Sequence, residues 1–281
     1  MERIAWLDGQ FIPLADAKVS AQDRGFLFAD GIYEVTAVLD GRLVESEAHL
    51  ARLQRSAAAL EITIPISTAE IEAIQRELIA RNVLQEGGIY LQLTRGAAER
   101  DFLAEPERPT LLMLTQAREI VANPAAETGV AVITMPDIRW KRRDIKSVML
   151  LAQVLAKRAA RAAGAQEAWL VEDGYVTEGA SSTALIVTQA GLLVARPNSE
   201  AILPGCTRIG ALAAAEKMGL AIEERLFTVE EALDAREAML TSASNFVLPI
   251  VTIDGRKVGD GEPGPIAREL RRLYIEAARA G

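Results

Sequence analysis

Two strings organise the chain: R-W-K-R-R-D-I-K-S-V-M-L-L-A-Q at residues 139–153 and E-A-W-L-V-E-D-G-Y-V-T-E-G-A-S-S at residues 167–182. Between Lys146 and Glu178 lies a long stretch of alanine and leucine in which Val148, Leu151 and Leu155 recur at the spacing of one helix face. This period predicts a helix that packs through those three side chains. The second string alternates as a strand does and contains a turn signal.

Lys146 and Glu178 are the two chemically interesting side chains in these strings. Lys146 lies just before the predicted helix, and Glu178 lies near the end of a hairpin predicted to turn at Asp173-Gly174. Burial lowers the pKa of an amine, and the neutral amine is the nucleophile that forms a Schiff base. Taken singly, each residue has a commoner explanation, because most lysines are solvated and a glutamate before a glycine is more often a turn residue. The surrounding strings therefore decide their meaning.

The whole pattern resembles a known family. D-I-K-S, an apolar helix and V-T-E-G-A-S-S closely resemble the core of the class IV aminotransferases, the fold-type IV enzymes that use pyridoxal 5′-phosphate. The resemblance runs from D-R-G-F-L-F-A-D-G-I-Y-E-V at residues 23–35 to I-D-G-R-K-V-G at residues 253–259, and it is nearest to the D-amino-acid aminotransferases. It implies a homodimer and a site between two domains.

The expected fold class is α+β, with a smaller N-terminal α/β domain and a larger C-terminal pseudo-barrel domain. Strand, helix and turn signals predict an N-terminal domain over residues 1–119 and a cofactor-binding domain over residues 128–281. Residues 120–127, which contain Asn123-Pro124, form the expected connector.

Composition excludes several classes of protein. The 281 residues are 50% hydrophobic and 25% charged, as in ordinary soluble globular proteins, and the net charge of −8 argues against nucleic-acid and membrane surfaces. Cys206 is the only cysteine and His49 the only histidine, so we expect no intrachain disulfide and no metal site. Without a charged leader followed by an apolar run, the expected location is the cytoplasm.

Arg52 is the first candidate for binding the cofactor. It lies in H-L-A-R-L at residues 49–53, on a predicted amphipathic helix where a surface arginine is the commoner case. The resemblance assigns it to the cofactor phosphate, with His49 as a supporting neighbour. A guanidinium suits that task because its planar fork donates two charge-assisted hydrogen bonds.

A second candidate phosphate site is the turn L-P-G-C-T-R at residues 203–208, which leads into a helix. Backbone N–H groups and the dipole at a helix N-terminus make an anion site, whereas Thr207 could equally be a plain N-cap. The resemblance assigns phosphate binding to Cys206 and Thr207, with Cys206 in place of the usual aliphatic residue.

The loop T-S-A-S-N at residues 241–245 is the third candidate. By resemblance it contacts the cofactor phosphate and the substrate carboxylate through Ser242 and Ala243. Because Ala243 has no hydroxyl, Ser242 or Ser244 must supply any side-chain oxygen. A plain polar loop is the alternative.

The substrate pocket is predicted from two strings. Tyr33 and Val35 point to the same face of a strand because they are two residues apart, and the resemblance places both beside the substrate. Arg100 and Phe102 lie where the best-known D-amino-acid aminotransferases carry R-x-H, whose arginine and histidine both bind the substrate carboxylate. Arg100 keeps one donor. Phe102 removes the other, so we expect an altered substrate range, or some activity toward amines without a carboxylate.

The resemblance implies the reaction. Lys146 would hold the cofactor and move a proton as general acid and base, while Glu178 would keep the pyridine nitrogen protonated. The amino group of a D-amino acid such as D-alanine would pass to a 2-oxo acid such as 2-oxoglutarate with ping-pong kinetics. The alternatives are a branched-chain L-amino-acid or (R)-amine aminotransferase of the same fold, then aminodeoxychorismate lyase, and from another class a non-catalytic binding protein.

Overall fold

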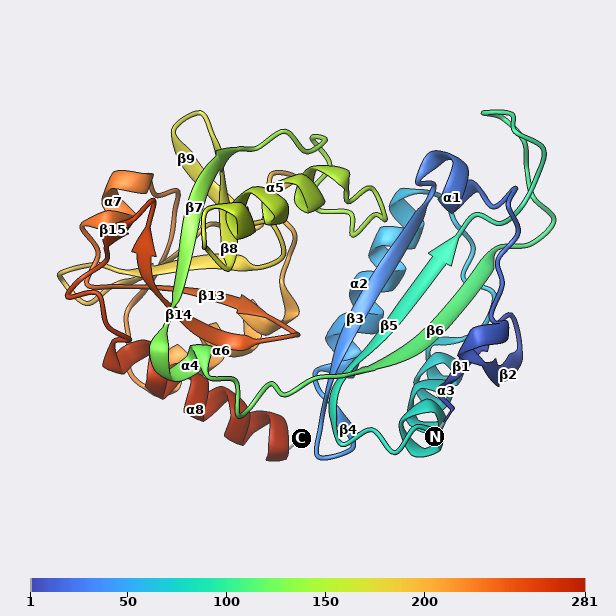
Figure 1. Cartoon of the computed structure of the whole chain (residues 1–281), viewed down its shortest axis with the longest axis horizontal. Coiled ribbons are helices and arrows are strands. Elements are labelled where there is room, and N and C mark those ends of the chain that lie inside the picture. Colours follow the sequence, from blue (N-terminus) through green and yellow to red (C-terminus); the bar gives the residue numbers. More distant parts are fainter. Residues whose placement is uncertain (1, 281) are drawn as a thin grey trace. The chain divides into compact units, whose positions relative to one another are not determined.

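The computed structural model describes residues 2–280 and divides them into two compact units (Figure 1). The first unit holds the residues up to Glu119 together with Ile145–Met149, and the second holds Ile120–Asp144 and the chain from Leu150 onward. Each unit packs helices against a sheet, which confirms the expected α+β class. Ile145–Met149 belong to the first unit by their contacts, although they lie within the segment 128–281 expected to form the second domain.

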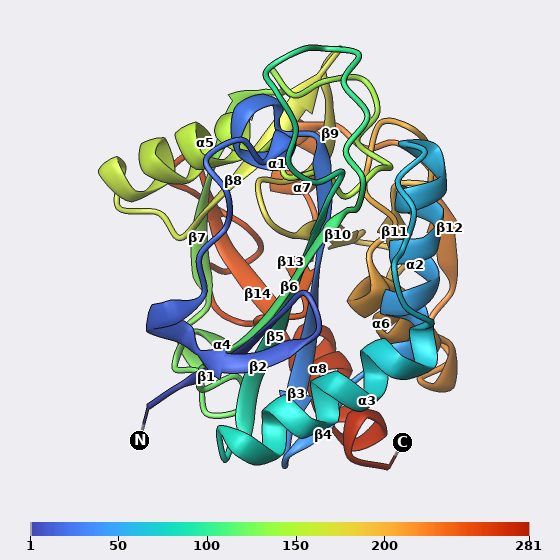
Figure 2. The same ribbon diagram turned by 90° about the vertical axis from the view of Figure 1, so that its right-hand side faces the viewer.

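The first unit is built on a six-stranded antiparallel sheet with the strand order β2-β1-β6-β5-β3-β4. The strands are β1 (Ile4–Leu7), β2 (Gln10–Pro13), β3 (Gly31–Leu39), β4 (Arg42–Leu43), β5 (Glu86–Thr94) and β6 (Thr110–Ala117). The helical segments are η1 (Leu14–Asp16), α1 (Arg24–Phe28), α2 (Ser46–Ala59) and α3 (Thr68–Arg81). Figure 2 shows β3, β5 and β6 side by side, with α2 and α3 beside the sheet.

The core of this unit follows from alternation along the central strands. Every second residue of β5 is buried, and its partners Ile32 in β3 and Met113 in β6 lie on the same buried face. Leu53 of α2 and Leu78 of α3 are also buried. The side chains of Tyr33 and Val35 point to the opposite face of the sheet, as the two-residue period predicts.

The second unit is built on a nine-stranded mixed sheet with the order β12-β11-β10-β13-β14-β7-β8-β9, and β15 pairs with β14. Its strands are β7 (Val130–Pro136), β8 (Glu167–Glu172), β9 (Tyr175–Gly179), β10 (Thr183–Val187), β11 (Leu193–Ala195), β12 (Ile222–Glu224), β13 (Glu237–Ser242), β14 (Phe246–Ile253) and β15 (Arg256–Lys257). Its helices are α4 (Ala125–Thr128), α5 (Leu151–Ala162), α6 (Cys206–Lys217), α7 (Val229–Leu233) and α8 (Pro265–Ala280). Because β9 also contacts β10, the sheet curls toward a half-barrel.

Two apolar clusters lie on the two faces of this curled sheet. The inner cluster includes Trp169 of β8 and Leu240 of β13, and Phe227 meets the edge of Trp169 with 6.0 Å between ring centroids. The outer cluster packs α6 and α8 against Leu185 and Met239. Hydrophobic burial on both faces therefore holds β10 and β13 in place. β13 ends at Ser242, and β10 begins at Thr183 beside the turn at Gly205, so both strands lead to predicted phosphate contacts.

The predicted packing of the helix that follows Lys146 is wrong. Leu151 and Leu155 are 69% and 45% exposed, and Val148 lies outside α5. The helix instead buries Ala156 and Ala160 against β8. The small alanine side chains let the α5 backbone approach the sheet closely. The alanine face of the helix is therefore buried, although the leucine pattern is more conspicuous in the sequence.

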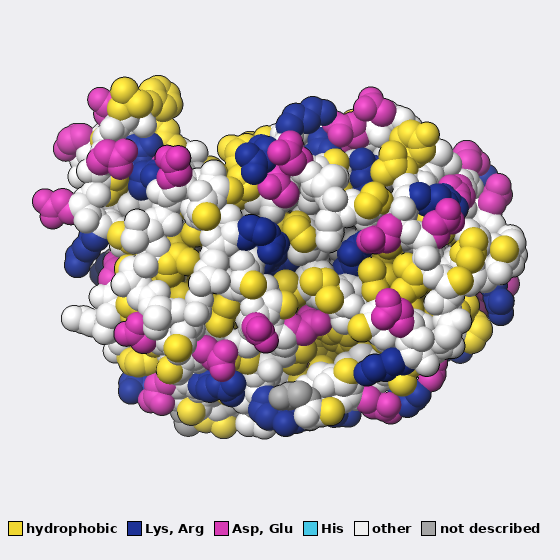
Figure 3. All heavy atoms as spheres, turned by 180° about the vertical axis from the view of Figure 1, so that it is seen from behind, with side chains coloured by type: hydrophobic (Ala, Val, Ile, Leu, Met, Phe, Trp, Pro, Cys, Tyr) yellow, Lys and Arg dark blue, Asp and Glu magenta, His cyan; other side chains and the backbone are white. Residues whose placement is uncertain are grey.

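The surface of the protein carries charges of both signs. On the face in Figure 3, acidic and basic side chains are interspersed, in keeping with a net charge of −8 spread over 39 acidic and 31 basic residues. Among residues 2–280, no helix is both long and apolar enough to span a bilayer. Within the same range, no group of three or more His, Cys, Asp or Glu residues is arranged to hold a metal ion.

Candidate active site

Lys146 lies in an extended segment paired with β3, five residues before α5 begins. The Tyr33 N–H donates to the Lys146 carbonyl at 2.9 Å, and the Val148 N–H donates to the Gly31 carbonyl at 3.0 Å. The Lys146 Nζ sits 4.2 Å from the centroid of the Tyr33 ring. The structure therefore brings together two predicted site residues, and a strand pairing rather than a helix N-terminus holds the lysine.

Tyr33 belongs to an aromatic and polar face that sequence reasoning described only in part. Val35 pairs with Tyr90 and Tyr33 pairs with Gln92 across β3 and β5, and the Tyr33 and Tyr90 rings stack with 5.8 Å between centroids. The Tyr90 hydroxyl donates to Gln92 Oε1 at 2.6 Å, and burial followed by the neighbouring Tyr33 raises the pKa of Tyr90 to about 12. Tyr90 is thus a neutral donor at physiological pH. Only the register with β3 could have identified it.

Arg52 is oriented by a buried carboxylate that sequence reasoning missed. Its Nε donates to Glu34 Oε1 at 2.8 Å and its Nη2 donates to Glu34 Oε2 at 2.7 Å, while His49 Nδ1 lies 2.8 Å from Glu34 Oε2. Burial alone would raise the pKa of Glu34, but the Arg52 guanidinium and His49 outweigh it and hold the pKa at about 2. The signal in the sequence was Glu34 itself, a carboxylate on the buried face of a strand, which requires a partner.

Glu178 stands at the end of β9, fully enclosed in the second unit. Its two oxygens accept the Leu203 N–H at 3.1 and 3.2 Å, and Arg139 Nη1 donates to Oε1. Arg139 also forks onto Asp137, with Nε and Nη2 at 3.0 and 2.7 Å from the two carboxylate oxygens. Burial raises the pKa of Glu178, and Arg139 opposes that rise. Asp137 and Arg139 are functional candidates that the motif reading did not select.

The N-terminus of α6 has no side-chain cap. Gly205 is the N-cap residue, so the alternative in which Thr207 serves as N-cap is wrong, and Cys206 and Thr207 are buried in the first turn. A Cβ atom on Gly205 would lie 2.7 Å from Thr183 Oγ1, which shows how closely the turn approaches β10. Glycine permits this approach, and the first-turn N–H groups supply positive potential there.

A buried hydroxyl lies beneath this turn. Thr183 pairs with Thr241 of β13, and Thr241 Oγ1 is buried without a hydrogen-bond partner among the described residues. Native proteins rarely leave a buried polar atom unpaired, so such an atom calls for an explanation. At the end of the same strand, Ser242 Oγ lies 3.3 Å from Ser244 Oγ and accepts from Asn245 Nδ2 at 3.3 Å. Ala243 contributes only its backbone to this loop.

Arg100 and Phe102 lie on the loop that joins β5 to β6. The Arg100 guanidinium carbon is 5.2 Å from the centroid of the Phe28 ring, and the Phe102 ring is also 5.2 Å from Phe28. Phe102 is 76% exposed. Both predicted substrate residues therefore gather on one aromatic ring of α1.

The predicted site residues thus fall into two groups, each inside one compact unit. The first unit holds Tyr33, Val35, Arg52, Arg100, Phe102 and Lys146. The second unit holds Glu178, Cys206, Thr207, Ser242 and Ala243. A cavity lined by residues 18–20 and 105–108 lies elsewhere in the first unit and includes none of them.

The chemistry of these groups fits the cofactor expected from the sequence. An amine such as that of Lys146 can bind an aldehyde as a Schiff base. A buried carboxylate such as Glu178 can accept a hydrogen bond from a protonated ring nitrogen. The uncapped turn of α6 and the unpaired hydroxyl of Thr241 are donors that a phosphate would satisfy. The unpaired Thr241 hydroxyl is the observation that tests whether these residues fit the cofactor, because a buried hydroxyl needs a polar partner and a phosphate would be one.

Comparisons with known proteins point the same way. A family model described as amino-transferase class IV matches residues 31–253. A D-alanine aminotransferase of Bacillus licheniformis is 38% identical over 266 residues, covering 94% of this chain and 93% of that protein. One of Staphylococcus haemolyticus is 38% identical over 277 residues, covering 97% and 98%.

Solved structures give a similar picture. The T.th. branched-chain amino acid aminotransferase with pyridoxamine 5′-phosphate has a TM-score of 0.91 at 25% identity, covering 100% of this chain and 95% of that one. A hypothetical aminotransferase from Mycobacterium tuberculosis, in a PLP-bound form, has a TM-score of 0.86 at 25% identity and covers 99% of each chain. The likeness therefore spans both compact units.

Proposed function

Because the chain belongs to the amino-transferase class IV family, whose cofactor is pyridoxal 5′-phosphate, we propose that it transfers the amino group of a D-amino acid to a 2-oxo acid. D-alanine and 2-oxoglutarate are the proposed donor and acceptor, and the two half-reactions follow each other in ping-pong order. Near full-length likeness to D-alanine aminotransferases supports the donor. The observation that carries the chemistry is the Lys146 amine held over Tyr33.

The proposed organisation follows the family. Residues 1–119 form an N-terminal α/β domain, residues 120–127 connect, and residues 128–281 form a cofactor-binding domain. The active species is a homodimer in the cytoplasm. A single buried cysteine supports that location, because a reducing compartment suits a chain with no disulfide to form.

Lys146 performs the proton transfers. When bound, the cofactor supplies the electron sink that stabilises negative charge on the substrate α-carbon. The Lys146 amine would hold the cofactor and would serve as the general acid and base that moves the proton at the substrate α-carbon. The Tyr33 ring limits where the amine can lie, because Nζ rests against its face. This contact restricts the positions that the base can take before a substrate binds.

Glu178 would face the pyridine nitrogen of the bound cofactor and favour its protonated form. A carboxylate stabilises the pyridinium charge, which an amide in the same place would not do. The Leu203 N–H and Arg139 fix both oxygens of Glu178. Arg139 also favours the ionised carboxylate that the pyridinium requires, against the effect of burial.

The phosphate is bound by residues that the fold orients in advance. Arg52 is held by its fork onto Glu34, and Cys206 and Thr207 offer the first-turn N–H groups of α6. Ser242 adds a hydroxyl and Ala243 adds its backbone. Preorientation lowers the conformational entropy lost on binding.

Tyr33, Val35, Arg100 and Phe102 contact the substrate. Arg100 binds the carboxylate, whereas Phe102 offers apolar surface where a histidine would donate a second hydrogen bond. The absence of this second hydrogen-bond donor at Phe102 is the observation that supports a second candidate function. A branched-chain L-amino-acid or (R)-amine aminotransferase is therefore the alternative, followed by aminodeoxychorismate lyase.

A half-reaction on purified protein loaded with pyridoxal phosphate tests the function. We expect D-alanine to bleach the visible cofactor band, and we expect L-leucine and (R)-1-phenylethylamine to do so much more slowly. Lys146→Ala should abolish bleaching by every donor. Bleaching by L-leucine or by the amine instead would move the assignment to that alternative, and a protein that never acquires a visible band is not an aminotransferase.

A further inference from the structure

The loop from Arg95 to Pro109, which carries Arg100 and Phe102, is closed at its base. Gly96 has a φ of 112°, and a Cβ atom there would lie 2.0 Å from the Arg108 carbonyl oxygen, so only glycine allows the two ends to approach. The Arg24 N–H donates to the Gly96 carbonyl at 2.8 Å. One end of the loop is thus bound to the start of α1 by its backbone.

The tip of the loop is held by the side chain of the same arginine. Arg24 Nη1 donates to the Asp101 carbonyl at 2.6 Å and Nη2 donates to the Phe102 carbonyl at 3.1 Å, while Nε donates to Asp30 Oδ2 at 2.8 Å. Arg24 is 6% exposed. Its guanidinium therefore binds two successive loop carbonyls and one partly buried carboxylate through a single planar group, which an ammonium cannot do.

Phe28 is the platform on which the loop side chains rest. The Arg24 guanidinium carbon is 4.9 Å from its ring centroid and that of Arg100 is 5.2 Å away. The Phe102 ring lies 5.2 Å from the same ring. Whatever fixes the backbone at Asp101 and Phe102 therefore also fixes where Arg100 and Phe102 lie on this platform.

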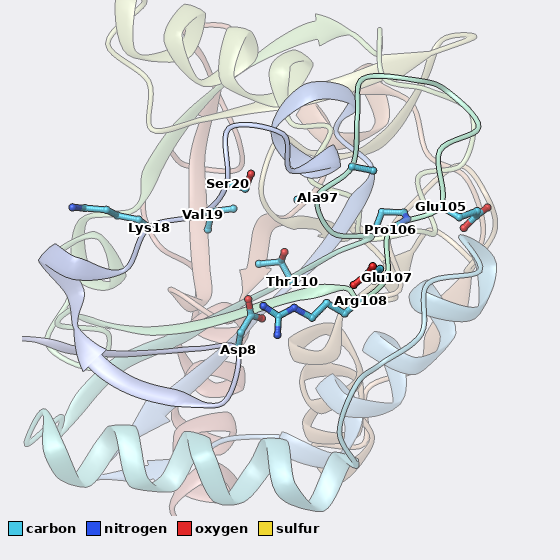
Figure 4. Close-up of a pocket in the computed structure, with 11 residues that line it drawn as sticks. Asp8, Lys18, Val19, Ser20, Ala97, Glu105, Pro106, Glu107, Arg108 and Thr110 are labelled. Atoms are coloured by element: carbon cyan, nitrogen blue, oxygen red, sulfur yellow. The ribbon is translucent and has the colours of Figure 1, made fainter.

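The other arm of the loop is loosely packed. A polar cavity of about 540 Å³ separates residues 105–108 from residues 18–20 (Figure 4). Phe102 and Leu103 are 76% and 86% exposed, so apolar burial does little to hold the tip. Within the part of the chain that the structure describes, Arg24 supplies the charged hydrogen bonds to the Asp101 and Phe102 carbonyls, while Gln22 Nε2 donates to Glu99 Oε1 at 2.8 Å.

From this geometry we propose that Arg24 is a positioning residue for substrate recognition: it holds the Asp101 and Phe102 carbonyls and thereby sets Arg100 to bind a substrate carboxylate. The proposal rests on the proposed function for the identity of that substrate. It explains how the loop can discriminate between a donor that has a carboxylate and an amine that lacks one, although Phe102 supplies no hydrogen bond.

Arg24→Lys in the full-length, cofactor-loaded enzyme tests the proposal, with Arg95→Lys as the matched control. Arg95 also pairs with Asp30, at 2.9 Å, but its other bonds go to the Leu60 and Glu61 carbonyls rather than to the loop. Both variants disturb the same carboxylate. Only Arg24→Lys removes the hydrogen bonds to the loop tip.

Two readouts are expected to move in Arg24→Lys and not in Arg95→Lys. Amide hydrogen exchange over residues 99–105 should become at least about tenfold faster, because the tip loses its anchor. In the half-reaction, the apparent Kd for D-alanine should rise roughly tenfold, the factor that a lost hydrogen bond from a charged group produces, with the limiting rate changed less than about twofold. Reaction with (R)-1-phenylethylamine should be unchanged, because this donor has no carboxylate.

Unchanged exchange at the loop, or equal losses for the two donors, would overturn the proposal. If wild-type protein prefers L-leucine, the proposed D-amino-acid function fails, while Arg24 is still tested with L-leucine against the amine. If Arg24→Lys does not fold, Phe28→Leu gives the decision, since removing the platform should weaken binding of the carboxylate donor several-fold and leave the amine unaffected. Equal behaviour toward both donors in that variant also refutes the positioning role.

Discussion

Glu34 is the buried carboxylate on which Arg52 and His49 converge. Glu34→Gln removes the negative charge that faces the buried Arg52 guanidinium, so we expect a loss of about 3–5 kcal/mol in the free energy of unfolding at pH 7. The pKa of Glu34 is about 2 in the folded protein against an ordinary value of 4.5, so its stabilisation is present above pH 4.5 and is lost as the pH falls toward 2. Urea unfolding of both proteins over this range should show the difference shrinking.

Glu77→Gln is the control for that experiment. Glu77 pairs with Arg81 one helical turn away, and both side chains are about half exposed. An exposed pair of this kind contributes no more than about 0.5 kcal/mol. A loss as large as that in Glu34→Gln would mean that burial is not what gives the Glu34 pair its strength.

Under the proposed function, Arg139 acts on the cofactor through Glu178. Burial already raises the pKa of Glu178, and Arg139 is the charge that opposes the rise, so Arg139→Met should raise this pKa further. Because the ionised carboxylate is the active form, the acidic limb of the kcat profile should move to higher pH. Steady-state rates from pH 5 to 9 measure the shift. Glu178→Gln should lose activity at every pH instead, and a Glu178→Gln enzyme that retains the limb would contradict the assignment.

At the scale of elements, one substitution where α6 packs on β13 should change stability and cofactor affinity in opposite directions. Thr241→Val keeps the shape of the side chain but removes its unpaired hydroxyl. The cofactor-free protein should gain about 1 kcal/mol, because an unsatisfied buried polar group is removed. Cofactor affinity should fall, because a phosphate donor is lost. Thermal unfolding without cofactor and a cofactor titration measure the two effects, and a cofactor-free protein that becomes less stable would show that the hydroxyl is satisfied.

Elements were predictable where the local pattern agrees with the packing. The hairpin of β8 and β9 turns at Asp173 and Gly174, both with positive φ, as the sequence predicted. The face of α5 was not predictable, since two alanines pack on β8 and the leucines do not. Helical period reports which residues share a face, but the partner decides which face is buried.

The candidate site residues were predictable through the family resemblance, but the side chains that pair with them were not. Lys146, Glu178 and Arg52 each follow from a short string, whereas Glu34 and Arg139 emerge only when strands and helices are assembled. Nothing local in the sequence pairs Glu34 with a residue 18 positions later, since that contact needs α2 to pack on β3. The candidate site was therefore proposed from motifs, whereas the ion pairs around it required the structure.

At the scale of the molecule, the first unit is completed by a segment distant in sequence. Ser147 bridges to Ile32, so Ile145–Met149 cover the edge of β3 at Gly31–Tyr33. A fragment of residues 1–119 would leave that edge unpaired, and unpaired edges promote aggregation. We therefore expect this fragment to be poorly soluble, and a fragment with residues 144–150 joined by a Gly-Ser linker to remain monomeric.

Amide exchange at Tyr33 gives the finer measurement for these fragments. The Tyr33 N–H donates to the Lys146 carbonyl at 2.9 Å, so the added segment should protect this amide, whereas a linker of equal length without residues 144–150 should not. Equal protection in both fragments would mean that β3 is stable without the segment. Protection by the segment alone would mean that the same backbone pairing completes the first sheet and fixes the position of Lys146.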